Sequence, residues 1–249
     1  MTRDLDGLVA LVTGGSRRIG LAIARDLAEA GAHVVISYVA DREAAASAVE
    51  TIRARGRQAI AVRADVRIPE QVQAMIQTIA GHFGRLDILV NSAALRSSLP
   101  LPDMTLAQWH DATDVVLDGA FLCAQAAEAL LTASGHGTIV NIGGLTANVG
   151  AARSPHVSTA KMGLVGLTRS LALHFGPSGV TVNCVVPGSI AAIEDLPDRT
   201  TRYAPLETIP MRRYGTPEDL AGVVRAVVGP AFRWVTGQAI QVNGGAFFG

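Results

Sequence analysis

Short apolar runs alternate along the chain with longer segments whose apolar residues recur at helical spacing. The short runs have the length of strands. Most are apolar on both faces, as expected for a central parallel sheet covered by helices. They occupy residues 8–14, 33–38, 58–65, 86–93, 137–144, 180–186 and 238–245. The longer segments predict helices over residues 19–30, 41–55, 69–83, 105–131, 155–175 and 216–228.

Residues that commonly begin or end helices lie at several of these boundaries. Pro69 lies at one start, and residues 216–219 supply a cap, a first-turn proline and two acids. Gly31 is expected to end the first helix. The strict alternation predicts an α/β fold, a doubly wound parallel sheet (Rossmann fold) of about seven strands with helices on both faces. The whole chain, residues 1–249, is expected to form one domain.

One irregular stretch, residues 188–215, is rich in Pro, Thr, Arg and Glu. It follows a strand end, where open α/β sheets bind their ligands. We therefore predict that this stretch is a substrate lid.

Composition narrows the classes of partner. Hydrophobic residues make up 49% of the chain, and 21 basic residues balance 21 acidic ones. Without a basic block, nucleic acid and anionic membranes are poor partners. We see no apolar run of membrane-spanning length and no signal core at the start, so a cytoplasmic protein is expected. Cys123 and Cys184 stand alone in apolar segments and are expected to be buried thiols.

A glycine-rich stretch, TGGSRRIG (residues 13–20), follows the first strand and opens the first helix. Glycines at such a junction let the backbone turn tightly and approach a pyrophosphate. The N–H groups at the start of the helix then face the anion. The position of this stretch, more than its glycine content, indicates a dinucleotide-binding loop.

With this loop and several further motifs, the chain resembles the short-chain dehydrogenases/reductases over nearly its whole length. The further motifs are ADV (64–66), NSAA (91–94), IVNI (139–142), Lys161, NCVVPGSI (183–190), GTPEDLA (215–221) and TGQAIQVNGG (236–245). The resemblance implies hydride transfer between a nicotinamide cofactor and a carbonyl or alcohol. It also implies a cofactor site made of Gly14, Ser16, Arg17, Arg18, Ile19, Gly20, Ser37, Asp65, Val66, Asn91, Ala93, Lys161, Pro187, Gly188 and Ile190.

The expected cofactor is NADP(H) rather than NAD(H). An acid at the end of the second strand would bind an unphosphorylated ribose, but this strand ends at Ser37 and Tyr38. Arg17 is expected to reach a 2′-phosphate, with Arg42 as a second candidate, because guanidinium donors suit phosphate. The simpler alternative is that Arg17 and Arg18 form a solvated pair.

Three positions depart from the family without excluding binding. They are Arg18 at the usual middle glycine, Ser92 in the NAG motif, and Ala192 where threonine is common.

The catalytic positions depart much further from the family. The resemblance implies a tyrosine that moves the proton, a serine that holds the oxygen, a lysine on the ribose and an asparagine that supports a water. Of these, only Lys161 is retained; the other positions hold Val157, Gly144 and Val116. A general acid contributes about 10²–10⁴-fold and an oxyanion donor about 10²–10³-fold. An ordinary ketone should therefore react far more slowly here.

Few residues offer a replacement proton source. His156 titrates in the right range, but one residue along a helix is a rotation of about 100°, so it would point elsewhere unless the helix start is distorted. The hydroxyls near it, Thr146, Ser154 and Ser158, are more simply explained as caps and loop polar groups. The tyrosines in or beside the lid, Tyr203 and Tyr214, are more simply explained as half-buried packing residues. The loop arginines Arg96 and Arg153 are more simply explained as solvated. Asp111, Asp114 and Asp118 share a helical face and favour a solvated or interface stripe over a metal site.

Three functions remain open. Lys161 is the single lysine among 21 basic residues, and with the glycine loop it indicates that cofactor binding is retained. That favours an NADP(H)-dependent oxidoreductase for a small-molecule substrate, with an unusual proton source. The alternatives are an inert cofactor-binding homologue and a non-redox enzyme that reuses the pocket. By resemblance, a homotetramer or dimer is expected, or a hetero-oligomer with an active sister subunit.

Overall fold

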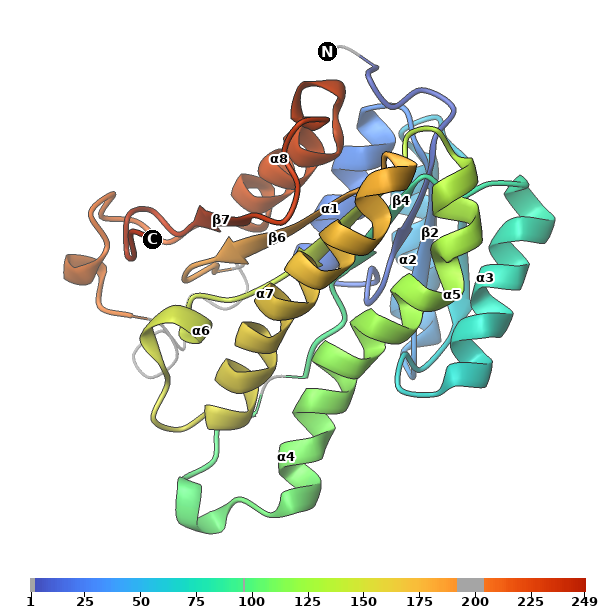
Figure 1. The fold of residues 1–249 in the computed structure, drawn as a ribbon. Coiled ribbons are helices and arrows are strands. Elements are labelled where there is room, and N and C mark those ends of the chain that lie inside the picture. Colours follow the sequence, from blue (N-terminus) through green and yellow to red (C-terminus); the bar gives the residue numbers. More distant parts are fainter. Residues whose placement is uncertain (1–2, 96, 192–203) are drawn as a thin grey trace.

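The chain folds around a parallel sheet of seven strands in the order β3-β2-β1-β4-β5-β6-β7 (Figure 1). The computed structural model describes residues 3–95, 97–191 and 204–249. The strands are β1 (Val9–Val12), β2 (His33–Tyr38), β3 (Ala59–Arg63), β4 (Ile88–Asn91), β5 (Thr138–Ile142), β6 (Thr181–Pro187) and β7 (Ala239–Val242). The predicted doubly wound sheet is confirmed, with strands that are mostly shorter than their apolar runs.

Helices cover both faces of this sheet. One layer holds α1 (Arg18–Glu29), α2 (Arg42–Arg53) and α8 (Pro217–Val228). The other holds α3 (Pro69–Phe83), α5 (Gly119–Ala133) and α7 (Pro155–Phe175). The short segments η1 (Leu101–Asp103), α6 (Thr146–Val149), η3 (Gly176–Ser178), η5 (Leu206–Thr208) and η6 (Pro230–Phe232) were not predicted, because they are too short to show a periodicity.

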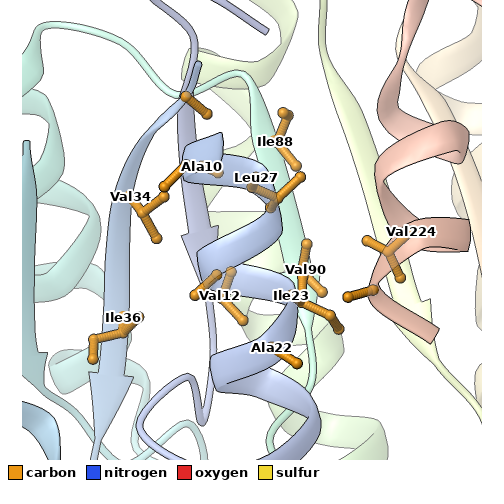
Figure 2. Packing of buried hydrophobic residues seen from close by; sticks show 14 of the residues in the cluster. Ala10, Val12, Ala22, Ile23, Leu27, Val34, Ile36, Ile88, Val90 and Val224 are labelled. Carbon is orange, nitrogen blue, oxygen red and sulfur yellow. The ribbon is translucent and has the colours of Figure 1, made fainter. Parts of the chain in front are cut away.

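The two-sided burial explains the unbroken apolar runs. Successive side chains of a strand point to opposite faces of the sheet. In β1, Ala10 and Val12 join the layer of α1, whereas Val9 and Leu11 join the opposite layer. Figure 2 shows Ile23 of α1 packed beside such residues, with α8 next to it. Every position of the strand therefore has to be apolar.

The segment predicted as one helix over 105–131 contains a change of helical type. It consists of α4 (Leu106–Thr113), a π-helical turn η2 (Asp114–Asp118) and α5. Gly119 N–H donates to the carbonyl of Asp114, five residues earlier. A Cβ at Gly119 would lie 2.6 Å from a methyl of Val66, so the glycine lets the helix approach the loop after β3. The predicted helix over 105–131 is confirmed in extent, and one of its turns is π-helical.

Length and hydropathy of this segment also correct an expectation from the sequence. Read as one helix, Leu106–Ala133 is long and apolar enough to cross a membrane. It packs against α3, α7 and β4 in the protein, and part of its apolar surface forms core. The expectation that the chain has no apolar run of membrane-spanning length is therefore wrong.

Helix ends follow the expected chemistry at two positions. Thr216 accepts a hydrogen bond from Asp219 N–H, and the Asp219 carboxylate accepts one from Thr216 N–H, which forms a capping box. Gly31 has a φ of +113° and follows Ala30, the C-cap of α1. A side chain there would be strained, so glycine suits this helix end.

A buried carboxylate joins three elements at the amino ends of β1 and β4. Asp87 is fully buried and accepts hydrogen bonds from Val9 N–H at 2.8 Å and from the Arg85 guanidinium at 2.7 and 2.9 Å. Ser134, which follows α5, donates to the same carboxylate. Asp87 thus fixes the entry of β4 against β1 and the end of α5.

Replacing Asp87 by Ala should lower the free energy of unfolding by about 2–3 kcal/mol, because a buried N–H and a hydroxyl lose their acceptor. Denaturant unfolding followed by circular dichroism measures the change. Asp103→Ala, at an exposed position, is the control and should stay within about 0.5 kcal/mol of the parent. Equal stability of the two variants would contradict this role for Asp87.

Candidate active site

A pocket of about 660 Å³ opens at the carboxyl ends of the strands. It runs from the loop after β1 and the end of β2, past the loops after β3 and β4, to α7 and the residues after β6. Most of the expected cofactor residues line it: Gly14, Ser16, Arg17, Arg18, Ile19, Gly20, Ser37, Asp65, Val66, Ala93, Lys161 and Ile190. Segments far apart in sequence therefore meet in one continuous site.

The glycine loop between β1 and α1 has no room for side chains at two positions. Gly14 has a φ of +64°, and a Cβ there would lie 3.1 Å from Ala93 Cα. A Cβ at Gly20 would overlap the carbonyl oxygen of Gly14. The bare backbone leaves a concave surface at the start of α1, where free N–H groups favour an anion. This shape fits the pyrophosphate of a dinucleotide.

Arg18 has an unusual backbone conformation within this loop. Its φ is +49°, one of two positive values among the described non-glycine residues. The left-handed conformation costs a side-chain-bearing residue about 1 kcal/mol. Arg18 thus adopts a backbone conformation that suits glycine better. Its side chain carries a guanidinium group, and the residue lines the pocket.

Two hydroxyl groups hold the loop against its neighbours. Thr13 Oγ1 accepts hydrogen bonds from the N–H groups of Ser92 and Ala93, each at 3.0 Å. Gly14 N–H donates to Ser37 Oγ at 3.2 Å. Ser37 therefore shapes the glycine loop in addition to lining the pocket.

The pocket beyond β2 contains an acid that the sequence reasoning did not single out. Asp41 lines it beside Arg17, and the two side chains lie 3.7 Å apart between Nη1 and Oδ2. The other carboxylate oxygen caps α2 by accepting from Ala44 N–H. Each carboxylate oxygen of Asp41 thus has a partner, and 70% of the Arg17 side chain remains exposed. Arg42 is exposed and is not among the lining residues.

Asp65 is paired with a second residue that the sequence reasoning missed. Arg67 Nε and Nη2 donate to the Asp65 carboxylate at 2.7–3.1 Å, and Arg67 also lines the pocket. These hydrogen bonds hold the pKa of Asp65 below its usual value. The expected adenine side of the site therefore has an ionised carboxylate with its counter-charge in place.

A ladder of buried amides lies behind the ribose region. Asn91 Nδ2 donates to Asn141 Oδ1, and Asn141 Nδ2 donates to Thr168 Oγ1, each at 2.9 Å. Asn91 Oδ1 is buried with no hydrogen-bond partner in the described structure. An unpaired buried acceptor is costly, and a ribose hydroxyl would satisfy it. Asn91 thus fits the cofactor, although it does not itself line the pocket.

Pro187 and Gly188 also lie just outside the lining residues. The Pro187 carbonyl accepts from Leu145 N–H, and Gly188 N–H donates to the Val242 carbonyl. A Cβ at Gly188 would lie 2.7 Å from Asn243 Cα. These residues fix the backbone that leads to Ile190, which does line the pocket.

Lys161 lies at the inner end of the pocket on α7. Its ammonium donates to the Ile142 carbonyl at 2.5 Å, and only 7% of the residue is exposed. Val157, one helical turn earlier, lines the same pocket. A Cβ at Gly144 would lie 3.5 Å from Lys161 Cγ, so this glycine borders the lysine stem. Val116 is buried in a small apolar cluster with residues of α5 and α7.

His156 does not line this pocket. It is fully buried at the start of α7, and its Nε2 lies 2.6 Å from Ser97 Oγ. Burial lowers the pKa of His156, which keeps the imidazole neutral near pH 7. The rotation expected from helix geometry is confirmed: Val157 lines the pocket and His156 contacts a different loop. The sequence reasoning missed Ser97.

Three of the remaining candidates have hydrogen-bond partners in the described structure. Ser154 Oγ donates to the Ser97 carbonyl, Arg153 Nε to Ser98 Oγ, and Tyr214 OH to the Ala204 carbonyl. Thr146 begins α6, and Ser158 Oγ is buried without a partner in the described structure. Arg96 and residues 192–203, which include Ala192, Tyr203 and the middle of the predicted lid, lie outside the described residues.

Two of the three acids on the predicted helical face lie near basic side chains, and both cysteines are buried. Asp111 pairs with Arg67, and Asp114 lies 3.9 Å from His110. No group of three metal-ligating side chains occurs within residues 3–95, 97–191 and 204–249. Cys123 and Cys184 are buried and unpaired, as expected, and burial raises their pKa values to about 12 and about 11.

Replacing Gly20 by Ala should abolish dinucleotide binding and destabilise the protein by about 1–3 kcal/mol, because the methyl group forces the loop away from α1. Fluorescence titration with NADPH and denaturant unfolding measure the two effects. The control is Gly166→Ala on an exposed turn of α7, where nothing lies within 4 Å of the added Cβ. This control should gain about 0.5–1 kcal/mol and bind normally. Unchanged binding by Gly20→Ala would contradict the assigned cradle.

Known proteins share this arrangement over their full length. Residues 14–246 match the family model described as enoyl-(acyl carrier protein) reductase. A protein of Synechocystis named 3-oxoacyl-[acyl-carrier-protein] reductase is 39% identical, and the match covers 97% of each chain.

Solved structures agree with the expected cofactor. A blue fluorescent protein from a metagenomic library, solved in complex with NADPH, has a TM-score of 0.92 and 35% identity, covering 98% of this chain and 100% of that one. A short-chain dehydrogenase from Burkholderia cenocepacia, solved with NADP, has a TM-score of 0.92 and 38% identity, covering 98% and 99%. The chain belongs to the short-chain dehydrogenase/reductase family of oxidoreductases.

Proposed function

We propose that this protein is an NADP(H)-dependent oxidoreductase that reduces the keto group of a 3-oxoacyl thioester or a similarly activated carbonyl. The observation that carries this proposal is the continuous pocket from the glycine loop to Lys161. Such a pocket fits an extended dinucleotide, with the glycine loop to hold its pyrophosphate and Lys161 to hold its nicotinamide ribose. When bound, the cofactor supplies the hydride.

Support for NADP(H) comes from charge as well as from similarity. Arg17 and Arg18 line the end of the pocket where a 2′-phosphate would lie. Asp41 is the acid nearest to that end, and it is already engaged by Arg17 and by the cap of α2. Guanidinium groups are suited to phosphate, and both solved relatives described above contain NADPH or NADP.

The substrate class rests on the name of the Synechocystis relative and on the chemistry of the site. In a 3-oxoacyl thioester, a second carbonyl withdraws electrons from the keto group and makes hydride acceptance easier. Such a substrate tolerates a weak proton donor better than a simple ketone does. The apolar side chains Val157 and Ile190 at this end of the pocket suit an acyl chain.

We further propose that Val157, Gly144 and Val116 occupy the positions of the family's catalytic tyrosine, serine and asparagine. Their placement supports this: Val157 shares the pocket with Lys161, and Gly144 borders the lysine stem. Lys161 would then bind the nicotinamide ribose without a tyrosine to activate. Proton supply, rather than hydride supply, becomes the weak step.

An inert cofactor-binding homologue is the second candidate, favoured by the apolar character of Val157 and Val116. Such a protein would act through assembly, as a homotetramer, a dimer, or a partner of an active subunit. Native mass spectrometry of the protein purified from its host distinguishes these assemblies. A third candidate, a non-redox enzyme, would reuse the same pocket.

Titration of NADPH and NADH into the purified protein tests the cofactor proposal. NADPH should bind more tightly, and Arg17→Ala should weaken NADPH binding about tenfold, as expected for the loss of one exposed charged hydrogen bond. NADH binding should barely change. Arg42→Ala is the control, because Arg42 does not line the pocket. Equal affinity for both cofactors would contradict the assignment, and no binding of either would overturn the oxidoreductase proposal.

Restoring the family's residues tests the proposed tetrad. The double variant Gly144→Ser/Val157→Tyr should raise the rate of reduction of an unactivated ketone by about 10²–10⁴-fold, the contribution of a general acid. A serine Cβ fits at position 144, since its nearest neighbour would be at an ordinary 3.5 Å. NADPH consumption in single-turnover experiments measures the rate, with Val157→Phe as the control without a hydroxyl. Equal rates for the tyrosine and phenylalanine variants would contradict the proposal.

A further inference from the structure

Two of the described residues that line the pocket are acids, and they are held very differently. The Asp65 carboxylate accepts hydrogen bonds from the Arg67 guanidinium at 2.7–3.1 Å, and only 12% of its side chain is exposed. Asp41 Oδ2 lies 3.7 Å from Arg17 Nη1, which is longer than a hydrogen bond, and 43% of the Asp41 side chain is exposed. The contact between Asp41 and Arg17 is therefore an ion pair without a hydrogen bond, which a competing anion can open.

The starts of two helices bring these side chains together. Arg17 directly precedes α1, and Asp41 directly precedes α2. Asp41 Oδ1 accepts a hydrogen bond from Ala44 N–H at 2.9 Å, so the cap of α2 holds the carboxylate in place. The Arg17 side chain makes no cap bond to α1, and most of it is exposed. The guanidinium can therefore turn toward a ligand, whereas the carboxylate stays where it is.

Asp41 lies at the end of the pocket that the proposed 2′-phosphate would occupy. Arg17, Ser37 and Asp41 all line this end. A phosphate monoester carries a charge of about −1.5 to −2 at pH 7. A neighbouring carboxylate repels such a group and competes with it for the same guanidinium. A ribose hydroxyl has no charge and meets neither effect, so one carboxylate acts unequally on the two nicotinamide cofactors.

We propose that Asp41 is a specificity-determining residue that limits the preference for NADPH over NADH. This inference rests on the NADP(H) site of the proposed function. Arg17 is paired with Asp41 in the free protein and exchanges it for the 2′-phosphate when NADPH binds. Asp41 keeps its bond to the cap of α2 and remains beside the phosphate as a like charge. NADH leaves the ion pair intact, so the preference that Arg17 creates is smaller than it would be without Asp41.

Calorimetric titration of Asp41→Asn with NADPH and NADH tests this role, because asparagine caps a helix as well as aspartate does. At low salt, NADPH should bind about three- to tenfold more tightly than to the parent, as expected for two interactions between partly exposed charges, whereas the Kd for NADH should change by less than about twofold. Unchanged binding of both cofactors would overturn the inference.

Glu43→Gln is the matched control for the charge of Asp41. It removes an acid from the first turn of the same helix, but Glu43 is exposed and does not line the pocket. Its effect on NADPH binding should stay below about twofold. Equal gains from Glu43→Gln and Asp41→Asn would overturn the inference, since the net charge of the protein would then explain both.

Salt and a second cap residue separate charge from hydrogen bonding. Asp41→Ser also caps a helix but has no amide, and at low salt it should match Asp41→Asn. In about 1 M salt the Debye length is about 3 Å, so the gain of either variant should fall to about twofold or less. A gain of Asp41→Asn that persists at high salt would overturn the inference, because the asparagine amide would then be acting as a donor to the phosphate.

The double variant Arg17→Ala/Asp41→Asn tests the exchange of partners. In the Arg17→Ala background, removal of the Asp41 charge should improve NADPH binding by a smaller factor than it does in the parent. The reason is that only the repulsion of the phosphate is then relieved, with no ion pair left to compete. An equal or larger factor in this background would show that Arg17 does not leave Asp41 and would overturn the exchange.

Adenosine 2′,5′-bisphosphate and 5′-AMP separate this inference from the proposed function, because neither contains a nicotinamide. Asp41→Asn should strengthen binding of the bisphosphate and leave binding of 5′-AMP unchanged. If the parent prefers NADPH and Asp41→Asn changes the affinity of neither NADPH nor the bisphosphate, this inference is overturned and the oxidoreductase proposal stands. If the parent binds neither NADPH nor NADH, both are overturned.

Discussion

Burial of the sheet on both faces is the constraint on which the rest of the molecule depends. With α1, α2 and α8 on one side and α3, α5 and α7 on the other, polar groups in the strands need partners within the core. Asp87 and the hydrogen-bonded series Asn91–Asn141–Thr168 are two cases in which buried polar groups have such partners. Chemistry is confined to the carboxyl edge of the sheet, where the glycine loop, Asn91 and Lys161 meet.

The sequence was sufficient where a pattern repeats or where a residue type has one conformational use. Two-sided apolar runs located all seven strands, and Gly14 and Gly20 marked the cradle. The sequence was insufficient where contacts between residues distant in the chain determine the structure. The π turn at residues 114–118 lies where Gly119 comes close to Val66, a residue distant in the chain. Asp41 and Arg67 were missed as pocket residues because nothing local distinguishes them from surface charges.

His156 shows how helix geometry and tertiary contacts combine. The rotation between neighbouring helical residues separated it from Val157, as the sequence indicated. Its partner Ser97 lies 59 positions earlier, and no spacing rule connects the two. The lack of a partner for Nδ1 is likewise visible only in the folded chain. A residue adjacent in sequence to Val157 is thus bound to a different loop.

Lys161 gives the protein an unusual response to amine chemistry. It is the only lysine, and it is buried at the inner end of the pocket, held by the Ile142 carbonyl. Acylating reagents therefore find the chain's one lysine amine sheltered by the fold. Any acylation of Lys161 reports that the inner end of the pocket has opened.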